Sequence, residues 1–240
     1  ETNLEFYETH LVEATHIMPN VNSVRCEIWY FRKNREPGKL LDYGFGYGQE
    51  LIYFAEQGYD VYGLDMVQSA KDKIDRYIRE NRPHLTNKIK TAILDLDATS
   101  LPYPDAWFDF IHSNQTIYHL PSEEAIKALL QEWYRILKPG GLLMFSTVGP
   151  QNTLVETGRL VGNNLYECES DSSGKIDGGT RLKMRSFLMQ DEAHIRSICG
   201  MFKIHEVGWF TNHYCGVDGF HWQVLASKPC ASAFITLGAL

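Results

Sequence analysis

Three glycines lie between two aspartates at a spacing that could serve a bound ligand. Gly44, Gly46 and Gly48 occupy every second position, Asp42 precedes them, and Asp65 follows. A glycine turn after a strand lets the backbone approach a ligand closely, because no Cβ intervenes and positive φ is allowed. An acid at the end of the next strand, about twenty residues on, can accept hydrogen bonds from a ribose diol. These residues predict a site for a ribose-containing cofactor.

The glycine turn alone leaves alternatives open. Dinucleotide sites favour G-x-G-x-x-G, whose helix N-terminus holds a pyrophosphate, whereas this chain has G-x-G-x-G. Tight turns also use glycine with no ligand, and Asp42 could simply cap backbone amides of the turn. The neighbouring elements must therefore be considered.

Strand and helix patterns alternate around this turn. Apolar runs predict strands at 39–43, 60–65, 89–96, 107–113, 142–148, 201–210 and 220–227. Helical spacing is found at 49–57, 67–81, 121–137 and 190–199. Regular alternation of this kind predicts an α/β fold with a doubly wound, mostly parallel sheet, and the short connection near the end predicts an antiparallel C-terminal hairpin.

The chain of 240 residues is predicted to form a single domain with four parts. Residues 1–38 are expected to form an N-terminal helical cap, and 39–148 the cofactor-binding core. Residues 150–180, rich in Gly, Asn, Ser and Asp, are expected to be an irregular insertion that serves as a lid or is mobile. Residues 181–228 should supply the last helix and the hairpin.

Composition excludes several function classes. The formal net charge is −7 and no run of Lys or Arg occurs, which argues against nucleic acid. The first residues carry no signal pattern, and no apolar stretch is long enough for a bilayer, so we expect a soluble, cytoplasmic protein without membrane contact. The absence of an initial Met suggests a trimmed sequence. Five cysteines without a CxxC pair favour reduced thiols and no metal site.

Further stretches resemble one family. The segment 96–111, LDATSLPYPDAWFDFI, is similar to the pattern D-A-x-x-L-P-F-x-D-x-x-F-D, and 133–146, WYRILKPGGLLMFS, matches a characteristic helix, turn and strand. With the glycine turn they span about residues 38 to 148 in the right order. On these residues the chain resembles the class I S-adenosylmethionine-dependent methyltransferases. The resemblance implies a seven-stranded, Rossmann-like sheet and treats KPGG as structural.

The resemblance also implies roles for individual residues. The glycines would face the amino-acid part of S-adenosyl-L-methionine, with Asp42 near its ammonium group and Asp65 on the ribose. Asp97 and Ala98 would bind the adenine, and Asn114 would lie near the cofactor, whose product is S-adenosyl-L-homocysteine. The implied cofactor-binding set is Asp42, Gly44, Gly46, Gly48, Asp65, Met66, Asp97, Ala98 and Asn114.

The turn departs from its relatives at two positions. They most often carry small residues where this chain has Phe45 and Tyr47. An aromatic face attracts a cation within about 6 Å, so these rings could stabilise a sulfonium. Packing under the loop and against the N-terminal helices is the favoured interpretation.

Methyl transfer from a sulfonium is an in-line displacement in which the enzyme mainly positions the reactants and excludes water. A general base is needed only where the nucleophile starts protonated. Candidate bases are His119, after the fourth strand, and His213 or His221 in the hairpin, because imidazole titrates near neutral pH. His119 is the first choice, although it could equally hold the neighbouring loop.

The segment SNQT at 113–116 narrows the range of possible methyl acceptors. It lacks the D/N-P-P-Y/F and Pro-Cys signatures of nucleic-acid methyltransferases, and the acids of metal-dependent catechol enzymes. We therefore expect a small-molecule acceptor with an O or N nucleophile, and hairpin aromatics suggest an aromatic or amine group. A nicotinamide-dependent reductase and a cofactor-binding module without catalysis stay as alternatives, and the sequence does not specify an oligomeric state.

Overall fold

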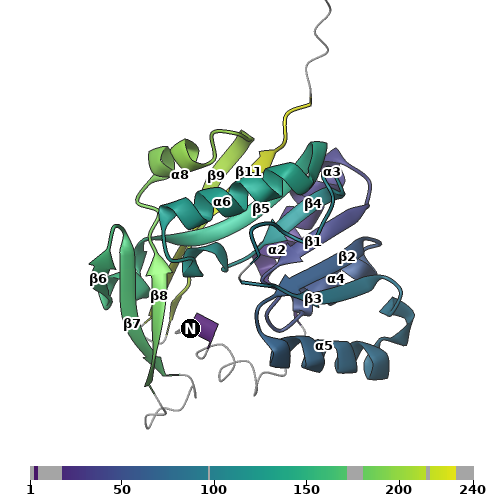
Figure 1. The fold of residues 1–240 in the computed structure, drawn as a ribbon, viewed down its shortest axis with the longest axis horizontal. Coiled ribbons are helices and arrows are strands. Elements are labelled where there is room, and N and C mark those ends of the chain that lie inside the picture. Colours follow the sequence, from purple (N-terminus) through teal and green to yellow (C-terminus); the bar gives the residue numbers. More distant parts are fainter. Residues whose placement is uncertain (1–2, 5–17, 97, 172–180, 215–216, 231–240) are drawn as a thin grey trace, which may run out of the picture.

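A computed structural model describes residues 3–4, 18–96, 98–171, 181–214 and 217–230. Its main sheet has the strand order β3-β2-β1-β4-β5-β11-β9, with the short β10 beside β11 (Figure 1). The strands are β1 (Lys39–Tyr43), β2 (Asp60–Asp65), β3 (Ile89–Ile93), β4 (Phe108–Ser113), β5 (Leu137–Asn152), β9 (Lys203–Phe210), β10 (His213–Tyr214) and β11 (Val217–Ser227).

Strand directions confirm the predicted fold class. β1 pairs in parallel with β2 and β4, β2 with β3, and β4 with β5. β11 then runs antiparallel to both β5 and β9. The first five strands therefore form a parallel sheet whose carboxyl ends meet at one edge, and the C-terminal hairpin extends it on one side.

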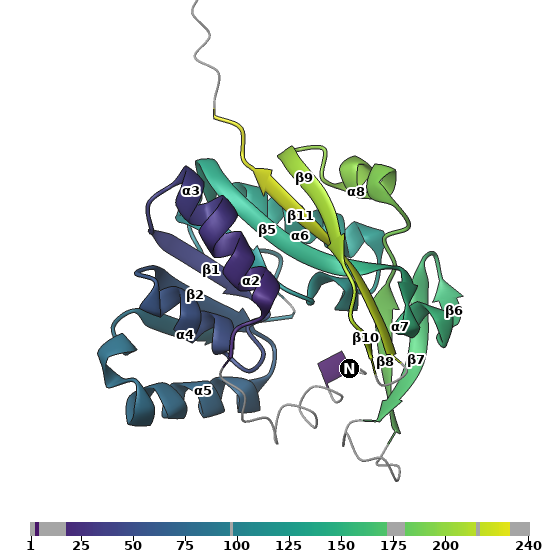
Figure 2. The same cartoon turned by 180° about the vertical axis from the view of Figure 1, so that it is seen from behind.

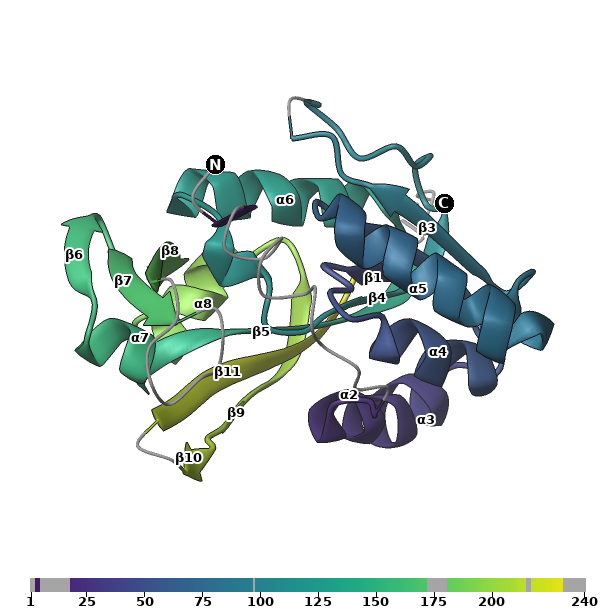
Figure 3. The same cartoon turned by 90° about the horizontal axis from the view of Figure 1, so that it is seen from below.

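Helices cover both faces of the sheet (Figures 1, 2 and 3). The alternation of side chains along β1 explains the two layers, because Leu41 belongs to the core cluster under α6, whereas Leu40 belongs to the cluster under α4 and α5. One face carries α6 (Glu123–Ile136) and α8 (Glu192–Ile198); the other carries α2 (Val21–Cys26), η1 (Glu27–Phe31), α3 (Arg32–Asn34), α4 (Gln49–Glu56) and α5 (Gln68–Asn81).

The N-terminal helix contains a π-helical turn. η1 follows α2 without a break and continues into α3, so 21–34 is one helix with a wider turn at 27–31. This turn buries Tyr30 and Phe31 against the sheet, and the Tyr30 hydroxyl donates to the carbonyl of Ala226 in β11 at 2.5 Å. The π-turn therefore fixes the helix on the main sheet.

The described part of the 150–180 segment is not irregular, so that expectation was wrong. It contains α7 (Thr153–Glu156), β6 (Arg159–Gly162) and β7 (Leu165–Asp171), and with β8 (Arg181–Phe187) the strands form a separate antiparallel sheet. Asn163 and Asn164 form the tight β6–β7 turn next to Gly162, and Asn164 has φ of 55°. They mark a hairpin rather than a loss of structure.

The KPGG segment was expected to be a turn but lies within β5, where the pairing with β4 shifts in register. Lys138 donates to Asp109 of β4 at 2.8 Å, and Asp109 also accepts from Arg35 at 2.6 Å and from the amide of Lys39 at 3.1 Å. The segment therefore anchors the strands at the end of the sheet opposite the glycine turn. In the described residues, no helix combines the length and hydropathy needed to span a membrane.

Candidate functional site

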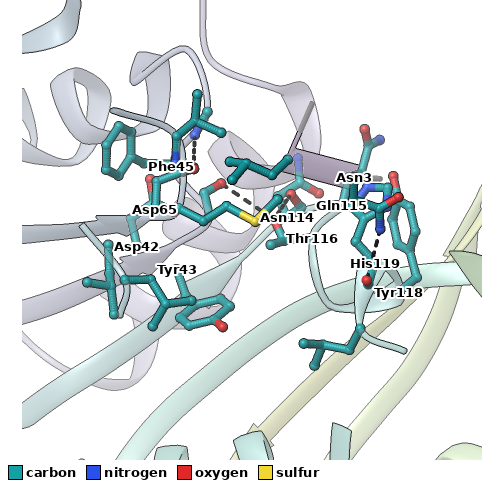
Figure 4. A pocket seen from close by; sticks show the side chains of 18 of the residues that line it. Asn3, Asp42, Tyr43, Phe45, Asp65, Asn114, Gln115, Thr116, Tyr118 and His119 are labelled. Carbon is teal, nitrogen blue, oxygen red and sulfur yellow. Dashed lines mark hydrogen bonds between the residues drawn. The ribbon is translucent and has the colours of Figure 1, made fainter. Parts of the chain in front are cut away.

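A cavity of about 610 Å³ lies at the carboxyl ends of β1, β2 and β4 (Figure 4). In open parallel sheets this edge is where ligands bind. Asp42 and Asp65 lie at one end of the cavity, and Asn3 and His119 lie at the other. We call these the carboxylate end and the His119 end.

The three glycines of the turn have different roles. Gly44 and Gly48 have φ of 77° and 78°, and a Cβ on them would overlap the side chains of Thr116 and Ile74 respectively. Gly46 has φ of 50°, lines the cavity, and has nothing within 4 Å of a Cβ position. Gly44 and Gly48 therefore permit close internal packing, whereas Gly46 leaves open space at the wall of the cavity.

Asp65 fastens the turn from the end of β2. One carboxylate oxygen accepts from the amide of Gly46 at 2.8 Å and the other from the amide of Val67 at 3.0 Å. Burial raises the pKa of Asp65, and these backbone hydrogen bonds oppose the rise. A carboxylate has about four acceptor positions, so Asp65 keeps capacity for ligand hydroxyls.

Two buried oxygens at the carboxylate end accept no hydrogen bond from the described residues. Oδ1 of Asp42 accepts from His112 Nδ1 at 2.8 Å, but the buried Oδ2 has no hydrogen-bond partner within the described part of the chain. The same holds for Oε1 of Gln49. Both residues line the cavity, as does the buried Glu50. Buried polar atoms are nearly always paired, so this end fits a ligand that donates hydrogen bonds and carries positive charge.

The predicted cofactor residues fall into three groups. Asp42, Gly44, Gly46, Asp65, Met66 and Asn114 line the cavity. Gly48 is not among its lining residues, because it packs against Ile74. Ala98 is exposed and lies outside the lining, to which Leu94 and Leu96 contribute instead. Asp97 lies outside the described residues.

The segment after β4 is built around Ser146. Its hydroxyl donates to Oδ1 of Asn114 at 2.8 Å and accepts from the amide of Gln115 at 2.7 Å. Gln115 has φ of 55°, a conformation that costs energy outside glycine and that often marks functional sites. Its side chain lines the cavity between the two ends. Gln115 was not predicted as a site residue.

The His119 end joins segments that are far apart in the sequence. The carbonyl of His119 accepts from Nδ2 of Asn3 at 3.0 Å, and His119 Nδ1 donates to the carbonyl of Arg185 at 3.4 Å. Asn3 also accepts from the amide of Arg185 at 2.9 Å and donates to its carbonyl at 3.1 Å. The side-chain amide of Asn3 thus pairs with β8 as a peptide group would.

Burial lowers the pKa of His119 to about 4, helped by His221 and opposed by the Arg185 carbonyl. The imidazole is therefore neutral near pH 7. Because Nδ1 donates to a carbonyl, Nε2 carries the lone pair. This suits acceptance of a hydrogen bond, but an imidazole with so low a pKa is a weak base.

The hairpin candidates have other surroundings. His213 lies in β10, where its backbone pairs with Asp218 of β11, and its catalytic role stays a prediction. His221 is buried, stacks on Phe210 and bonds the carbonyl of Gly219 at 2.8 Å. Of the hairpin aromatics, Trp209 stacks on Phe220. None of the hairpin residues whose side chains are described is in the lining of the cavity.

The two unusual aromatics of the turn differ. Phe45 is buried in the core beside Leu51, and a Cβ on Gly63 would meet its ring at 2.9 Å. This favours packing for Phe45. Tyr47 is only half-buried and packs against the same core cluster, and both aromatics line the cavity beside Gly46.

Residues 41–145 match a family model described as "Methyltransferase domain". The match begins at the strand that carries Asp42 and ends within β5, so it contains both Asp42 and Asp65 of the carboxylate end. This part of the chain is therefore a methyltransferase domain. Among the described residues of this methyltransferase, no group of three or more His, Cys, Asp or Glu is arranged to hold a metal.

Similar proteins share mainly this core of the methyltransferase. The bifunctional biotin biosynthesis protein BioHC of Cellvibrio japonicus is 35% identical over 121 residues, which are 50% of this chain and 22% of that protein. Phosphoethanolamine N-methyltransferase 1 of Zea mays is 32% identical over 115 residues, 47% of this chain and 21% of that protein. The matched region is therefore about a fifth of each of these two relatives.

The fold is shared more widely. A crystal structure of a SAM-dependent methyltransferase from Methanosarcina mazei superposes with a TM-score of 0.67 at 19% identity. The similarity covers 83% of this chain and 97% of that one, so it extends beyond residues 41–145.

Proposed function

We propose that this methyltransferase binds S-adenosyl-L-methionine at the carboxylate end and transfers its methyl group to a small molecule at the His119 end. The observation that carries the proposal is the pair of buried, unpartnered acceptors on Asp42 and Gln49 beside an open glycine. An ammonium group would satisfy them, and Asp65 would accept from ribose hydroxyls. When bound, the cofactor supplies an electrophilic methyl group and leaves as S-adenosyl-L-homocysteine.

The chain's own contribution is to position the reactants. Asp65 holds the glycine turn, Ser146 holds Asn114 and Gln115, and Asn3 ties the far wall to β8. These contacts fix the two ends of the cavity relative to one another, as an in-line displacement requires. A neutral amine can attack without prior deprotonation, which agrees with the weakly basic His119.

The acceptor is proposed to be a small molecule without an anionic group near the transferred methyl. Among the described lining residues, Arg185 is the single cationic side chain, and its guanidinium bonds Glu167 at 3.0 Å through two nitrogens. A phosphate or carboxylate of the acceptor would therefore lack a cationic partner at the His119 end. A neutral amine or hydroxyl needs no cationic partner, so both O and N acceptors fit.

Isothermal titration with S-adenosylmethionine and S-adenosylhomocysteine tests the cofactor proposal, and NADH serves as the control for a nicotinamide site. We expect binding of both methionine-derived ligands and none of NADH. Failure of both to bind would refute the proposal. Radiolabelled methyl transfer to pools of neutral amines, alcohols and phenols, compared with phosphorylated amines, then tests the acceptor class.

A further inference from the structure

A buried chain of hydrogen bonds leads from the N-terminal helix to Asp42. The amide of Asn20 donates to Oε1 of Glu50 at 3.0 Å, and Ser23 Oγ donates to the same oxygen at 3.3 Å. Ser23 Oγ also lies 3.0 Å from Nε2 of His112. Nδ1 of His112 then meets Oδ1 of Asp42 at 2.8 Å. Neither Ser23 nor His112 is exposed, and Asp42 is 2% exposed.

The order Ser23, His112, Asp42 resembles a nucleophilic triad, but the geometry excludes that chemistry. The Ser23 hydroxyl is fully buried and donates to Glu50. A nucleophile needs access to its substrate and a site for the developing oxyanion, and Ser23 does not line the cavity. The chain of groups must therefore act on Asp42, its one member with an unpartnered atom.

His112 fixes the orientation of the Asp42 carboxylate. The two residues are direct partners in the β1–β4 register, so their side chains stand on the same face of the sheet. The imidazole is held in turn by Ser23 and by edge-to-face contact with Phe54, at 5.0 Å between ring centroids. Oδ1 is bound to His112, and the buried Oδ2 is the oxygen of Asp42 that has no partner among the described residues.

We propose that His112 and Ser23 are positioning residues that aim Oδ2 of Asp42 at the cofactor's ammonium group. The inference rests on the proposed function. It adds that recognition of this one group depends on α2, since Ser23 lies in α2 and Asn20 caps it. Asn20 also lines the cavity, so the start of α2 and the carboxylate end are one structural unit.

The test compares two ligands that differ in a single group. One is S-adenosylhomocysteine, and the other is its analogue with a hydroxyl in place of the ammonium. In His112→Phe we expect affinity for S-adenosylhomocysteine to fall roughly tenfold or more, because a charge-assisted hydrogen bond loses its orientation. Affinity for the hydroxyl analogue should stay within about twofold, since that ligand does not use the charge of Asp42.

Two milder variants keep the test decisive if His112→Phe does not fold. His112→Asn retains a donor toward Asp42 and should recover most of the discrimination between the ligands. Ser23→Ala removes only the link to α2. It should lower the ratio of the two ligand affinities by about threefold. Thermal melting confirms that each variant is folded.

An equal loss of affinity for both ligands would mean that His112 and Ser23 have a purely structural role, and it would overturn the inference. Unchanged affinities in all folded variants would also overturn it. If the unmodified protein binds neither ligand, the proposed function itself fails. That result is distinct from any difference between variants.

Discussion

The two ends of the cavity are built in different ways. The carboxylate end comes from strand ends within 41–145, the region that matches the family model, and its groups are fixed by backbone amides and strand register. The His119 end is completed by Asn3 and β8, which lie outside that region. Under the proposed function, we expect the shared core to recognise the cofactor and the flanking segments to select the acceptor.

The largest effect should come from breaking the packing of the glycine turn. In Gly44→Ala the new Cβ would overlap Thr116 at a φ of 77°, so the free energy of unfolding should fall by roughly 2 to 4 kcal/mol. Gly46→Ala is the matched control, because its Cβ meets no neighbour. It should cost only about 1 kcal/mol of stability, yet weaken binding of S-adenosylhomocysteine. Urea denaturation and titration measure the two quantities, and equal stability losses would contradict this division.

Removal of the Asp65 carboxylate should affect the carboxylate end alone. For Asp65→Ala we expect cofactor affinity to fall by roughly 1.5 to 3 kcal/mol, through loss of charge-assisted hydrogen bonds. Asp60→Ala is the control, since Asp60 lies at the other end of β2 and is exposed. Unchanged affinity in Asp65→Ala would mean that the ribose binds elsewhere.

Protonation of His119 should destabilise the protein in acid. The folded pKa of about 4 lies below the ordinary 6.5, so the unfolded chain binds the proton more tightly. The contribution of this pKa difference to the free energy of unfolding is complete above pH 6.5 and is lost as the pH falls toward 4. Relative to His119→Gln, the wild type should lose about 2 to 3 kcal/mol between pH 7 and 4. Parallel pH dependences of the two proteins, measured by urea denaturation, would contradict the pKa shift.

The smallest effect is expected at the His119 end of the cavity. Asn3→Ala removes neutral hydrogen bonds to His119 and Arg185, each contributing about 1 kcal/mol. KM for the acceptor should rise several-fold, whereas the dissociation constant of S-adenosylhomocysteine should not change. Asn34→Ala, a substitution in α3, serves as the control. A parallel loss of cofactor affinity would show that the two ends are not independent.

The sequence predicted the carboxylate end better than the His119 end, for a physical reason. Asp65 ends an apolar run before a helix, so local pattern alone places it at a strand end. The contact of His112 with Asp42 joins residues 70 apart and depends on strand register, which local pattern does not determine. The contact of Asn3 with Arg185 joins residues 182 apart and has no local signal.

The second sheet was missed for a related reason. β7 and β8 pair across 172–180, and Gly and Asn in the β6–β7 turn suggested a loop because turns and loops share these residues. Only the pairing of β7 with β8 distinguishes the two cases, and it brings Arg185 to the cavity.

The π-turn of the N-terminal helix has a consequence for the direction in which α2 faces. A π-helical turn closes its hydrogen bonds over one residue more than an α-helical turn, so η1 takes up one extra residue within a single turn. If the same sequence formed a regular α-helix throughout, α2 would be rotated by about 100° relative to α3. Ser23 would then face away from His112, although its own position in the sequence had not changed. The wider turn of η1 therefore sets the helical phase that brings Ser23 to the carboxylate end.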